Sequence, residues 1–323
     1  MHLEGLIAAP FTAMKADRSI NLDMIEKQAA FYAANGVAGV FVCGTTGEGL
    51  LLTVQERLDI ADVWCQVALG TLKVIVHVGE NSVDACCQMA ARAQRAGAYA
   101  VGAMAPNFFR PATVEVLVDY CAEIAASAPK LPFYYYHMPS MTGVNFAMID
   151  FLKKASGRIP NLAGIKYTYE DMMDYQLCRV FEDGRYDILF GRDEMLLCGL
   201  VLGTRGAVGS TYNFAAPLYC RLIDEFRKEH LDKARQYQLL SMQMIKILAT
   251  IGCPFLSASK ALMKYLGVDC GPVRLPLTDI SAAQFDSMIA RLEQIGLSDF
   301  CSRQPAPVQS DVKRYSPVSG VRP

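Results

Sequence analysis

Short apolar runs alternate with longer amphipathic stretches along the first 230 residues of the chain. The apolar runs carry almost no charge before their last residues and are bounded by Gly, Pro or polar residues, which is typical of strands buried on both faces of a parallel sheet. Eight strands are predicted on this basis, at residues 6–11, 39–43, 74–78, 100–105, 133–136, 163–166, 188–190 and 206–209.

A stretch with helical spacing of its apolar residues follows each predicted strand. Eight repeats of strand and helix favour closure of a parallel sheet into a (β/α)8 TIM barrel over residues 1–229. An open, doubly wound α/β sheet is the alternative, and it is weakened because no GxGxxG motif opens the first helix. The predicted helices lie at 21–35, 53–69, 82–96 and 113–128, after Asn145, and from Glu170, Asp193 and Ala215.

The alternation stops after residue 229. Three helical stretches without intervening strands, at 231–250, 255–266 and 281–295, predict a C-terminal helical extension over residues 230–297. Pro, Ser, Gln and Arg dominate from Ser298 onward, so residues 298–323 are predicted to form a flexible tail.

Composition narrows the classes of partner. The formal net charge of -1 comes from scattered acidic and basic residues, so no basic stripe for nucleic acid is expected, and the expected ligand is a small molecule. No apolar run reaches the length of a membrane span, and no signal peptide is apparent, so no membrane partner is expected.

The eleven cysteines form no CxxC pair and favour a reduced, cytoplasmic protein. The four histidines are scattered, and we expect neither a metal ion nor another cofactor.

Two predicted strands end on reactive side chains, Tyr136 and Lys166. A buried ammonium is costly unless it is paired or loses its proton. A neutral Lys166 could attack a carbonyl and form a Schiff base, and the phenol of Tyr136 could move the protons that this reaction needs. The alternative is that Lys166 extends to solvent from the strand end and that Tyr136 is a half-buried aromatic residue.

Polar residues also follow the other strands. The segment 44–48 reads GTTGE, in which Thr45 and Thr46 could converge with backbone amides on an anion such as a carboxylate. An ordinary turn followed by a helix cap is the alternative for this segment. Residues at the carboxyl ends of barrel strands lie on one rim. Whether the segment 44–48 binds an anion therefore depends on the residues that follow the other strands.

The rim is predicted to contain further polar groups. Thr168 lies on the same side of its strand as Lys166, because side chains alternate with a period of two. This set suits a polyhydroxylated ligand, although two adjacent acids at a helix start can simply complement the helix dipole. Phosphate is a weaker alternative, because no Lys or Arg directly follows the last strand. Besides Thr168, the carboxylates of Asp193 and Glu194 follow the seventh predicted strand, and the hydroxyls of Ser210 and Thr211 follow the eighth.

Four segments carry a resemblance to a known family. The chain resembles the pyruvate-dependent class I Schiff-base aldolases, which include dihydrodipicolinate synthase and N-acetylneuraminate lyase. Its segments 133–137 (FYYYH), 190–194 (FGRDE) and 206–213 (GAVGSTYN) look most like the N-acetylneuraminate-cleaving branch. The resemblance rests on the segments 44–48 (GTTGE), 136–143 (YHMPSMTG), 164–168 (GIKYT) and 206–213.

The resemblance implies reversible cleavage of N-acetylneuraminate to N-acetylmannosamine and pyruvate. It implies that Lys166 forms the Schiff base, that Tyr136 transfers the proton, and that Thr45 and Thr46 hold the pyruvyl carboxylate. It also implies a homotetramer. The hydroxyl groups of the sugar are assigned, by the same resemblance, to Thr168, Gly191, Asp193, Glu194 and Ser210.

Two positions depart from patterns seen among relatives. Dihydrodipicolinate synthases resemble this chain but carry an arginine where it has Met141, which favours a substrate without a distal charge. Many relatives place a tyrosine for a neighbouring subunit where this chain has Phe109. Another pyruvate aldolase, or a barrel that binds a keto acid or sialic acid without catalysis, therefore remains an alternative.

Overall fold

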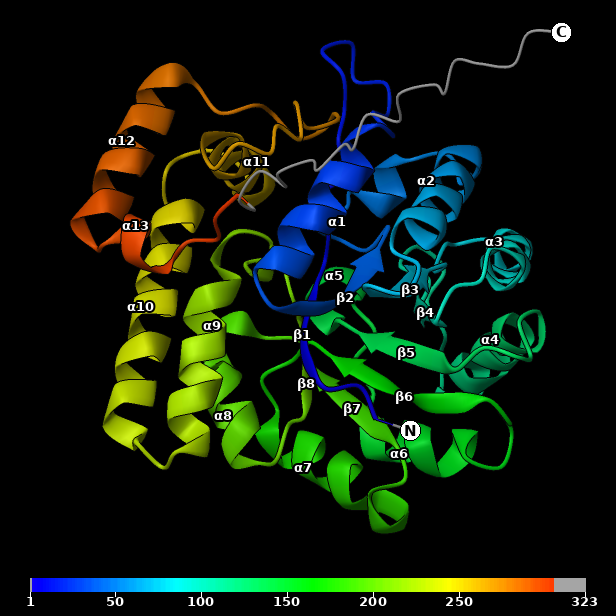
Figure 1. Cartoon of the computed structure of the whole chain (residues 1–323). Coiled ribbons are helices and arrows are strands. Elements are labelled where there is room, and N and C mark those ends of the chain that lie inside the picture. The colour runs from blue at the N-terminus through cyan, green and yellow to red at the C-terminus, as the bar shows by residue number, and fades with distance from the viewer. Residues whose placement is uncertain (1, 305–323) are drawn as a thin grey trace, which may run out of the picture.

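Eight parallel strands form a closed barrel in the order of the sequence. The computed structural model describes residues 2–304 (Figure 1). The first strand pairs with the eighth, which confirms the barrel and excludes the open sheet. The strands are β1 (Gly5–Ala8), β2 (Val37–Val42), β3 (Lys73–His77), β4 (Ala100–Met104), β5 (Phe133–His137), β6 (Leu162–Tyr167), β7 (Asp187–Phe190) and β8 (Gly206–Gly209).

Two separate apolar layers explain why the strands read as unbroken hydrophobic runs. In β5, Tyr134 and Tyr136 belong to a cluster inside the barrel, whereas Phe133 and Tyr135 belong to the larger core between the strands and the helices. Side chains of a strand alternate between its two faces, and here both faces are buried. The strand register thus decides which side chains reach the barrel interior.

Helices surround the barrel, and most begin where the sequence predicts. Thr53 caps α2 through a capping box with Glu56, and Ser82 and Thr113 cap α3 and α4. The barrel helices are α1 (Met24–Ala34), α2 (Val54–Val67), α3 (Val83–Arg95), α4 (Val114–Ala126), α5 (Pro139–Thr142), α6 (Met148–Ala155), α7 (Met172–Val180), α8 (Leu196–Val201) and α9 (Tyr212–Arg227), with 3-10 turns η1 (Gly49–Leu51), η2 (Phe181–Gly184) and η3 (Asp193–Met195).

Several elements differ from the prediction, among them the first strand, which ends at Ala8 rather than at Phe11. The helix expected from Ala215 starts at Tyr212, and Ala215 lies inside it although its backbone departs from helical geometry. The helix expected from Asp193 is a 3-10 turn that continues into α8. The short helix α5 was not predicted, because four residues are too few to show a helical period.

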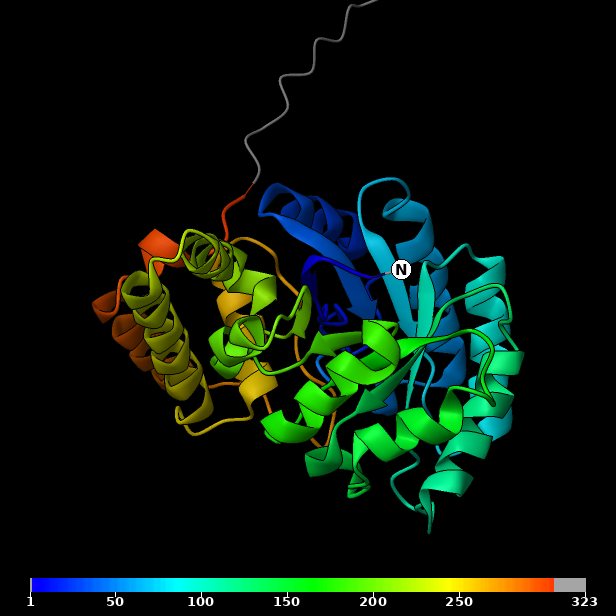
Figure 2. The ribbon, with the colours of Figure 1, turned by 90° about the horizontal axis from the view of Figure 1, so that it is seen from below.

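The C-terminal helices form a layer on one side of the barrel. Helix α10 packs along α9, and Figures 1 and 2 both show this layer beside the barrel and away from α3 and α4. The division of the chain at residue 229 stays a prediction, because this packing joins the two parts continuously. The layer contains α10 (Leu231–Ala249), α11 (Phe255–Tyr265), α12 (Ala282–Gln294) and α13 (Leu297–Phe300).

The start of the predicted tail is packed against the barrel. Phe300 is buried, and the Ser302 amide donates to the Phe214 carbonyl at 2.7 Å. The Arg303 amide donates to the Asn35 side chain at 2.9 Å. The segment 298–304 is therefore not a free tail, and the rest of the predicted tail, residues 305–323, lies outside the described residues.

All eleven cysteines are unpaired thiols, and most of them are buried. No helix within residues 2–304 is long and apolar enough to cross a lipid bilayer.

Candidate active site

The strand register places Lys166 directly beside Tyr136. Lys166 on β6 pairs with Tyr136 on β5 and with Leu189 on β7, and all three residues face the barrel interior. The Lys166 amine lies 3.8 Å from the centre of the Tyr136 ring and 4.0 Å from the centre of the Phe41 ring. The structure thus brings together the two reactive residues that the sequence singles out.

The Lys166 amine is enclosed rather than solvated. The residue is 4 % exposed, which excludes the alternative of a lysine that extends to solvent. Burial lowers the pKa of Lys166 to about 7, and the nearby Asp193 carboxylate opposes this shift. A substantial fraction of the amine is therefore neutral near pH 7, as a nucleophilic lysine requires.

This pKa predicts a pH dependence for reaction with a ketone. Between pH 6 and pH 8 the neutral fraction of an amine with a pKa of about 7 increases roughly tenfold. We expect the initial rate of pyruvate adduct formation, trapped with borohydride and measured by intact mass, to increase by a similar factor. Tyr136 stays protonated throughout this range and adds no opposing change, whereas the Asp193 carboxyl, with a pKa of about 6, becomes more charged and opposes part of the increase. A rate that is flat or decreases over these two pH units would contradict a neutral amine as the attacking group.

The Tyr136 hydroxyl points toward the 44–48 loop. Its oxygen lies 3.3 Å from the Thr45 Oγ, and it donates to the Met138 sulfur at 2.9 Å. Burial raises the pKa of Tyr136 to about 12, so the phenol is protonated at neutral pH. The phenol can therefore donate a proton to a neighbouring group and recover it later.

The two threonines of the 44–48 loop have different surroundings. Thr45 lines a cavity of about 230 Å³ at the mouth of the barrel, together with Met141 and His77. The Thr46 Oγ lies 2.6 Å from the Ser210 Oγ, so the loop is joined to the end of β8. Gly49 follows the loop where a Cβ would overlap the Cys43 carbonyl, so the tight turn requires glycine.

Asp193 is held at the end of β8 by hydrogen bonds. Its carboxylate accepts from the Thr211 amide at 2.8 Å and from the Thr211 hydroxyl at 2.6 Å. Burial raises the pKa of Asp193 to about 6, while these hydrogen bonds act in the opposite direction. A Cβ at Gly209 would overlap this carboxylate, so Gly209 makes room for it.

Thr168 is buried, and its Oγ has no hydrogen-bond partner among the described residues. Its backbone amide donates to the His137 carbonyl at 2.9 Å, which fixes its place at the end of β6. Gly191 lies against this side chain, and a Cβ at Gly191 would overlap the hydroxyl. An unsatisfied buried hydroxyl at the mouth of the barrel is suited to a polar ligand.

The contact between Gly191 and Thr168 yields a second prediction. Gly191→Ala should displace the Thr168 hydroxyl and raise the KM for a polyhydroxylated substrate by about tenfold, the scale of one or two lost hydrogen bonds. Pyruvate adduct formation should be unchanged, because the amine is untouched. Gly157→Ala is the matched control, since a Cβ there meets no atom within 4 Å. Equal KM values for the two variants would contradict this role of Gly191.

Arg192 was not singled out by the sequence analysis. It forms ion pairs with Glu170 and with Glu194, and its Nη1 lies 3.3 Å from the Glu194 Oε1. Glu194 is partly exposed at the rim, and its carboxylate is paired with the Arg192 guanidinium. The FGRDE segment contained the arginine, but its pairing with Glu170 depends on how neighbouring strands are placed.

Phe41 was also missed, and it supplies one of the two rings that enclose the lysine amine. His137 is fully buried among Tyr135, Tyr167 and Tyr169. Burial lowers the pKa of His137 to about 4, so this side chain is neutral.

A closed (β/α)8 barrel that buries a partly neutral lysine against a tyrosine, beside a loop suited to a carboxylate, has the arrangement of a class I aldolase, an enzyme that acts through a lysine Schiff base. The model of the dihydrodipicolinate synthetase family matches residues 2–295. The chain belongs to this family.

Three relatives show how far the similarity extends. N-acetylneuraminate lyase A of Xenopus laevis is 38 % identical over 286 residues, which cover 88 % of this chain and 93 % of the relative. N-acetylneuraminate lyase of Homo sapiens is 36 % identical over 302 residues, covering 92 % and 94 %. The solved structure of Proteus mirabilis N-acetylneuraminate lyase has a TM-score of 0.89 at 39 % identity and covers 92 % of this chain and 100 % of that one.

Proposed function

We propose that the protein is an aldolase-type lyase that cleaves N-acetylneuraminate reversibly to N-acetyl-D-mannosamine and pyruvate. The observation that carries the proposal is the buried Lys166 amine, with a pKa of about 7, against the Tyr136 ring. The similarity to N-acetylneuraminate lyases over most of the chain supports this choice of substrate.

In the proposed reaction the Lys166 amine attacks the keto carbon of the open sugar acid. Loss of water gives an iminium, which draws electrons from the carbon–carbon bond to be broken. Tyr136 takes part in moving the proton from the hydroxyl that becomes the aldehyde, and the enamine carbon receives a proton in turn. Hydrolysis of the remaining iminium releases pyruvate and restores the amine.

The polar groups of the rim have proposed roles in binding. Thr45 and Thr46 hold the pyruvyl carboxylate, and the Thr46 contact with Ser210 supports a fixed position for the pair. Thr168 offers a free buried hydroxyl, and Asp193 and Glu194 offer carboxylate acceptors for sugar hydroxyls. Gly191 and Ser210 complete this proposed set.

Met141 supports a substrate with an uncharged distal end. Its side chain is 59 % exposed and lines the cavity beside Thr45. A cation would be needed at such a position to offset a second carboxylate, as on aspartate semialdehyde condensation products. The second candidate is another pyruvate aldolase of the family. The absence of a cation at Met141 favours a different sugar acid over aspartate semialdehyde as its substrate.

The test is to incubate the protein with N-acetylneuraminate and quantify N-acetylmannosamine and pyruvate by mass spectrometry. A panel of other sugar acids, and aspartate semialdehyde with pyruvate, is assayed in parallel. We expect equal amounts of the two products from N-acetylneuraminate and the highest kcat/KM for it. A higher kcat/KM for another acid would move the proposal to that substrate, and binding of pyruvate without turnover of any acid would favour the non-catalytic alternative.

We also propose that the protein is a cytoplasmic homotetramer. The unpaired thiols support a reducing compartment. The apolar residues Met173, Leu177 and Val180 lie one turn apart on one exposed face of α7, which supports a contact with a second copy. Sedimentation equilibrium should give about four times the chain mass of 35.4 kDa. A monomeric mass at assay concentrations would overturn the assembly.

A further inference from the structure

A buried ion pair joins the C-terminal helical layer to the 44–48 loop. The Lys260 amine on α11 lies 2.6 Å from the Glu48 Oε1, and both side chains are almost completely buried. The Glu48 Oε2 accepts from the Arg274 amide at 2.8 Å. The Lys260 amine also donates to the Pro272 carbonyl at 2.8 Å.

The Glu48 carboxylate is bound by Lys260 and by the Arg274 amide, both outside the 44–48 loop, although Glu48 lines the same cavity as Thr45. Its backbone has a φ of 55°, in the left-handed region that is unfavourable for a glutamate. The Glu48 amide donates to the Thr45 carbonyl at 3.1 Å, which closes a tight turn. The turn thus places Thr45 at the cavity and Thr46 against Ser210, while the Glu48 carboxylate joins the turn to Lys260 and Arg274.

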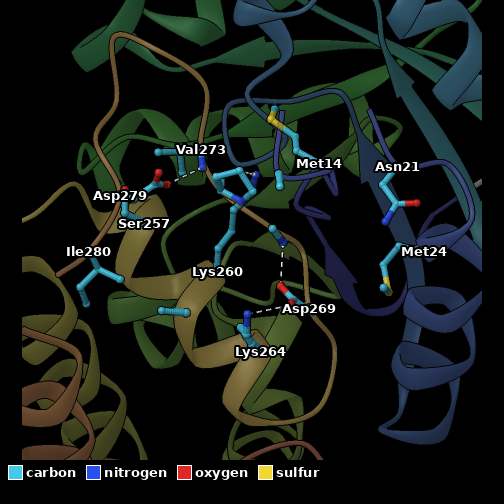
Figure 3. Close-up of a pocket in the computed structure, with 14 residues that line it drawn as sticks. Met14, Asn21, Met24, Ser257, Lys260, Lys264, Asp269, Val273, Asp279 and Ile280 are labelled. Carbon is cyan, nitrogen blue, oxygen red and sulfur yellow. Dashed lines mark hydrogen bonds and ion pairs between the residues drawn. The ribbon is translucent and has the colours of Figure 1, made fainter. Parts of the chain in front are cut away.

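The segment that accepts the Lys260 hydrogen bond is itself held by hydrogen bonds. Figure 3 shows Lys260 rising from α11 toward the segment that carries Val273. Within this segment, the Val273 amide donates to the Asp279 carboxylate at 2.9 Å. The Arg274 guanidinium then forms two hydrogen bonds of 2.8 Å to Glu56 near the start of α2. The ammonium therefore has a fixed position relative to the barrel.

A buried ion pair contributes little net stability, because desolvation of both charges offsets their attraction. Two well-packed apolar side chains could join α11 to the loop equally well. A charged pair adds a constraint on position, since each partner loses much of its stabilisation when the distance increases. The pair is thus suited to fixing a turn whose backbone is itself unfavourable.

We propose that Glu48 and Lys260 are positioning residues that fix the 44–48 loop for the carboxylate of pyruvate. This inference rests on the proposed function, in which Thr45 and Thr46 hold that carboxylate. The pair sets the affinity for pyruvate and does not take part in the chemical step at Lys166.

The test compares a neutral, near-isosteric pair with the charged one. In the double variant Glu48→Gln with Lys260→Met, no buried charge is left unpaired, so the barrel should remain folded. Borohydride trapping at increasing pyruvate concentrations gives a half-saturating concentration and a maximal rate. We expect the half-saturating concentration to rise by about tenfold, as a displacement below 1 Å can cause, while the maximal rate changes little.

Two further variants make the result decisive. Lys264→Met removes a lysine one turn further along α11 that pairs with Asp269 at the surface, and it should behave as the wild type (Figure 3). Lys260→Arg keeps the charge but has a larger head group, so it should fold and still raise the half-saturating concentration.

The inference is overturned if either folded variant, the double variant or Lys260→Arg, retains the wild-type half-saturating concentration. It is also overturned if the maximal rate falls while the half-saturating concentration does not change. A wild-type protein that forms no adduct at any pyruvate concentration would instead refute the proposed function, so the two failures are distinguishable.

Discussion

Lys166→Ala is expected to form no adduct with pyruvate under borohydride and to lose lyase turnover by up to about 10⁶-fold, the scale seen when a covalent nucleophile is removed from other enzymes. The reason is that Lys166 is the amine enclosed by Phe41 and Tyr136, and its lowered pKa of about 7 leaves much of it neutral for attack on the ketone. Intact mass after reduction and a coupled pyruvate assay measure the two effects. Lys153→Ala, which removes an exposed lysine, is the control.

The stability of this variant separates loss of chemistry from loss of fold. The pKa of Lys166 is lowered from 10.5 to about 7 by folding, so between these pH values the unfolded chain holds a proton that the folded protein has released. The free energy of unfolding of the wild type should therefore rise with pH from about 7 to 10.5 through this group. The free energy of unfolding of Lys166→Ala should lack this rise between about pH 7 and 10.5. An inactive variant that is already unfolded at the temperature and pH of the assay would mean that its inactivity does not report on the nucleophile.

Tyr136→Phe is expected to keep pyruvate binding and to lose turnover by about 100-fold or more, as for a lost acid–base group. The phenylalanine ring retains the contact with the lysine amine and the edge contact with Phe41, whose centre lies 5.4 Å away. Only the hydroxyl beside Thr45 is removed. Adduct formation with pyruvate and the steady-state kcat measure the two effects separately.

Tyr134→Phe is the matched control for this prediction. Tyr134 lies two residues earlier on the same strand and also faces the barrel interior, but its hydroxyl donates to Asp187 at 2.9 Å. Removing that hydroxyl should cost about 1–3 kcal/mol of stability and leave turnover intact. Full activity of Tyr136→Phe, or an equal loss in both variants, would remove Tyr136 from the proposed proton transfer.

The barrel was predictable because each strand is buried on both faces and each helix on one. Two different periods therefore alternate along the chain, and eight repeats leave few topologies. The boundaries that failed are those decided by tertiary contacts. Ala215 is kept inside α9 despite its non-helical backbone, and residues 298–304 are ordered by contacts with Phe214 and Asn35, which no local pattern reveals.

The candidate site was predictable to the extent that its residues end strands. Lys166 and Tyr136 could be paired in advance, because neighbouring parallel strands present their carboxyl ends together. Phe41 and Arg192 were missed because their contacts depend on register across strands and on side-chain direction. Glu48 was placed within the 44–48 motif, but its partner Lys260 lies in a different layer of the fold, and sequence spacing contains no information on that pairing.

Because Tyr136 and Lys166 are paired across β5 and β6, activity depends on the register of these two strands. A shift of one residue between β5 and β6 would turn one of the two side chains outward into the helix layer, so no slipped sheet can be partly active. Enzymatic rate and barrel integrity should consequently vanish at one temperature on heating. An assay of pyruvate release during a thermal ramp would then record the melting of the strands themselves, without any optical probe.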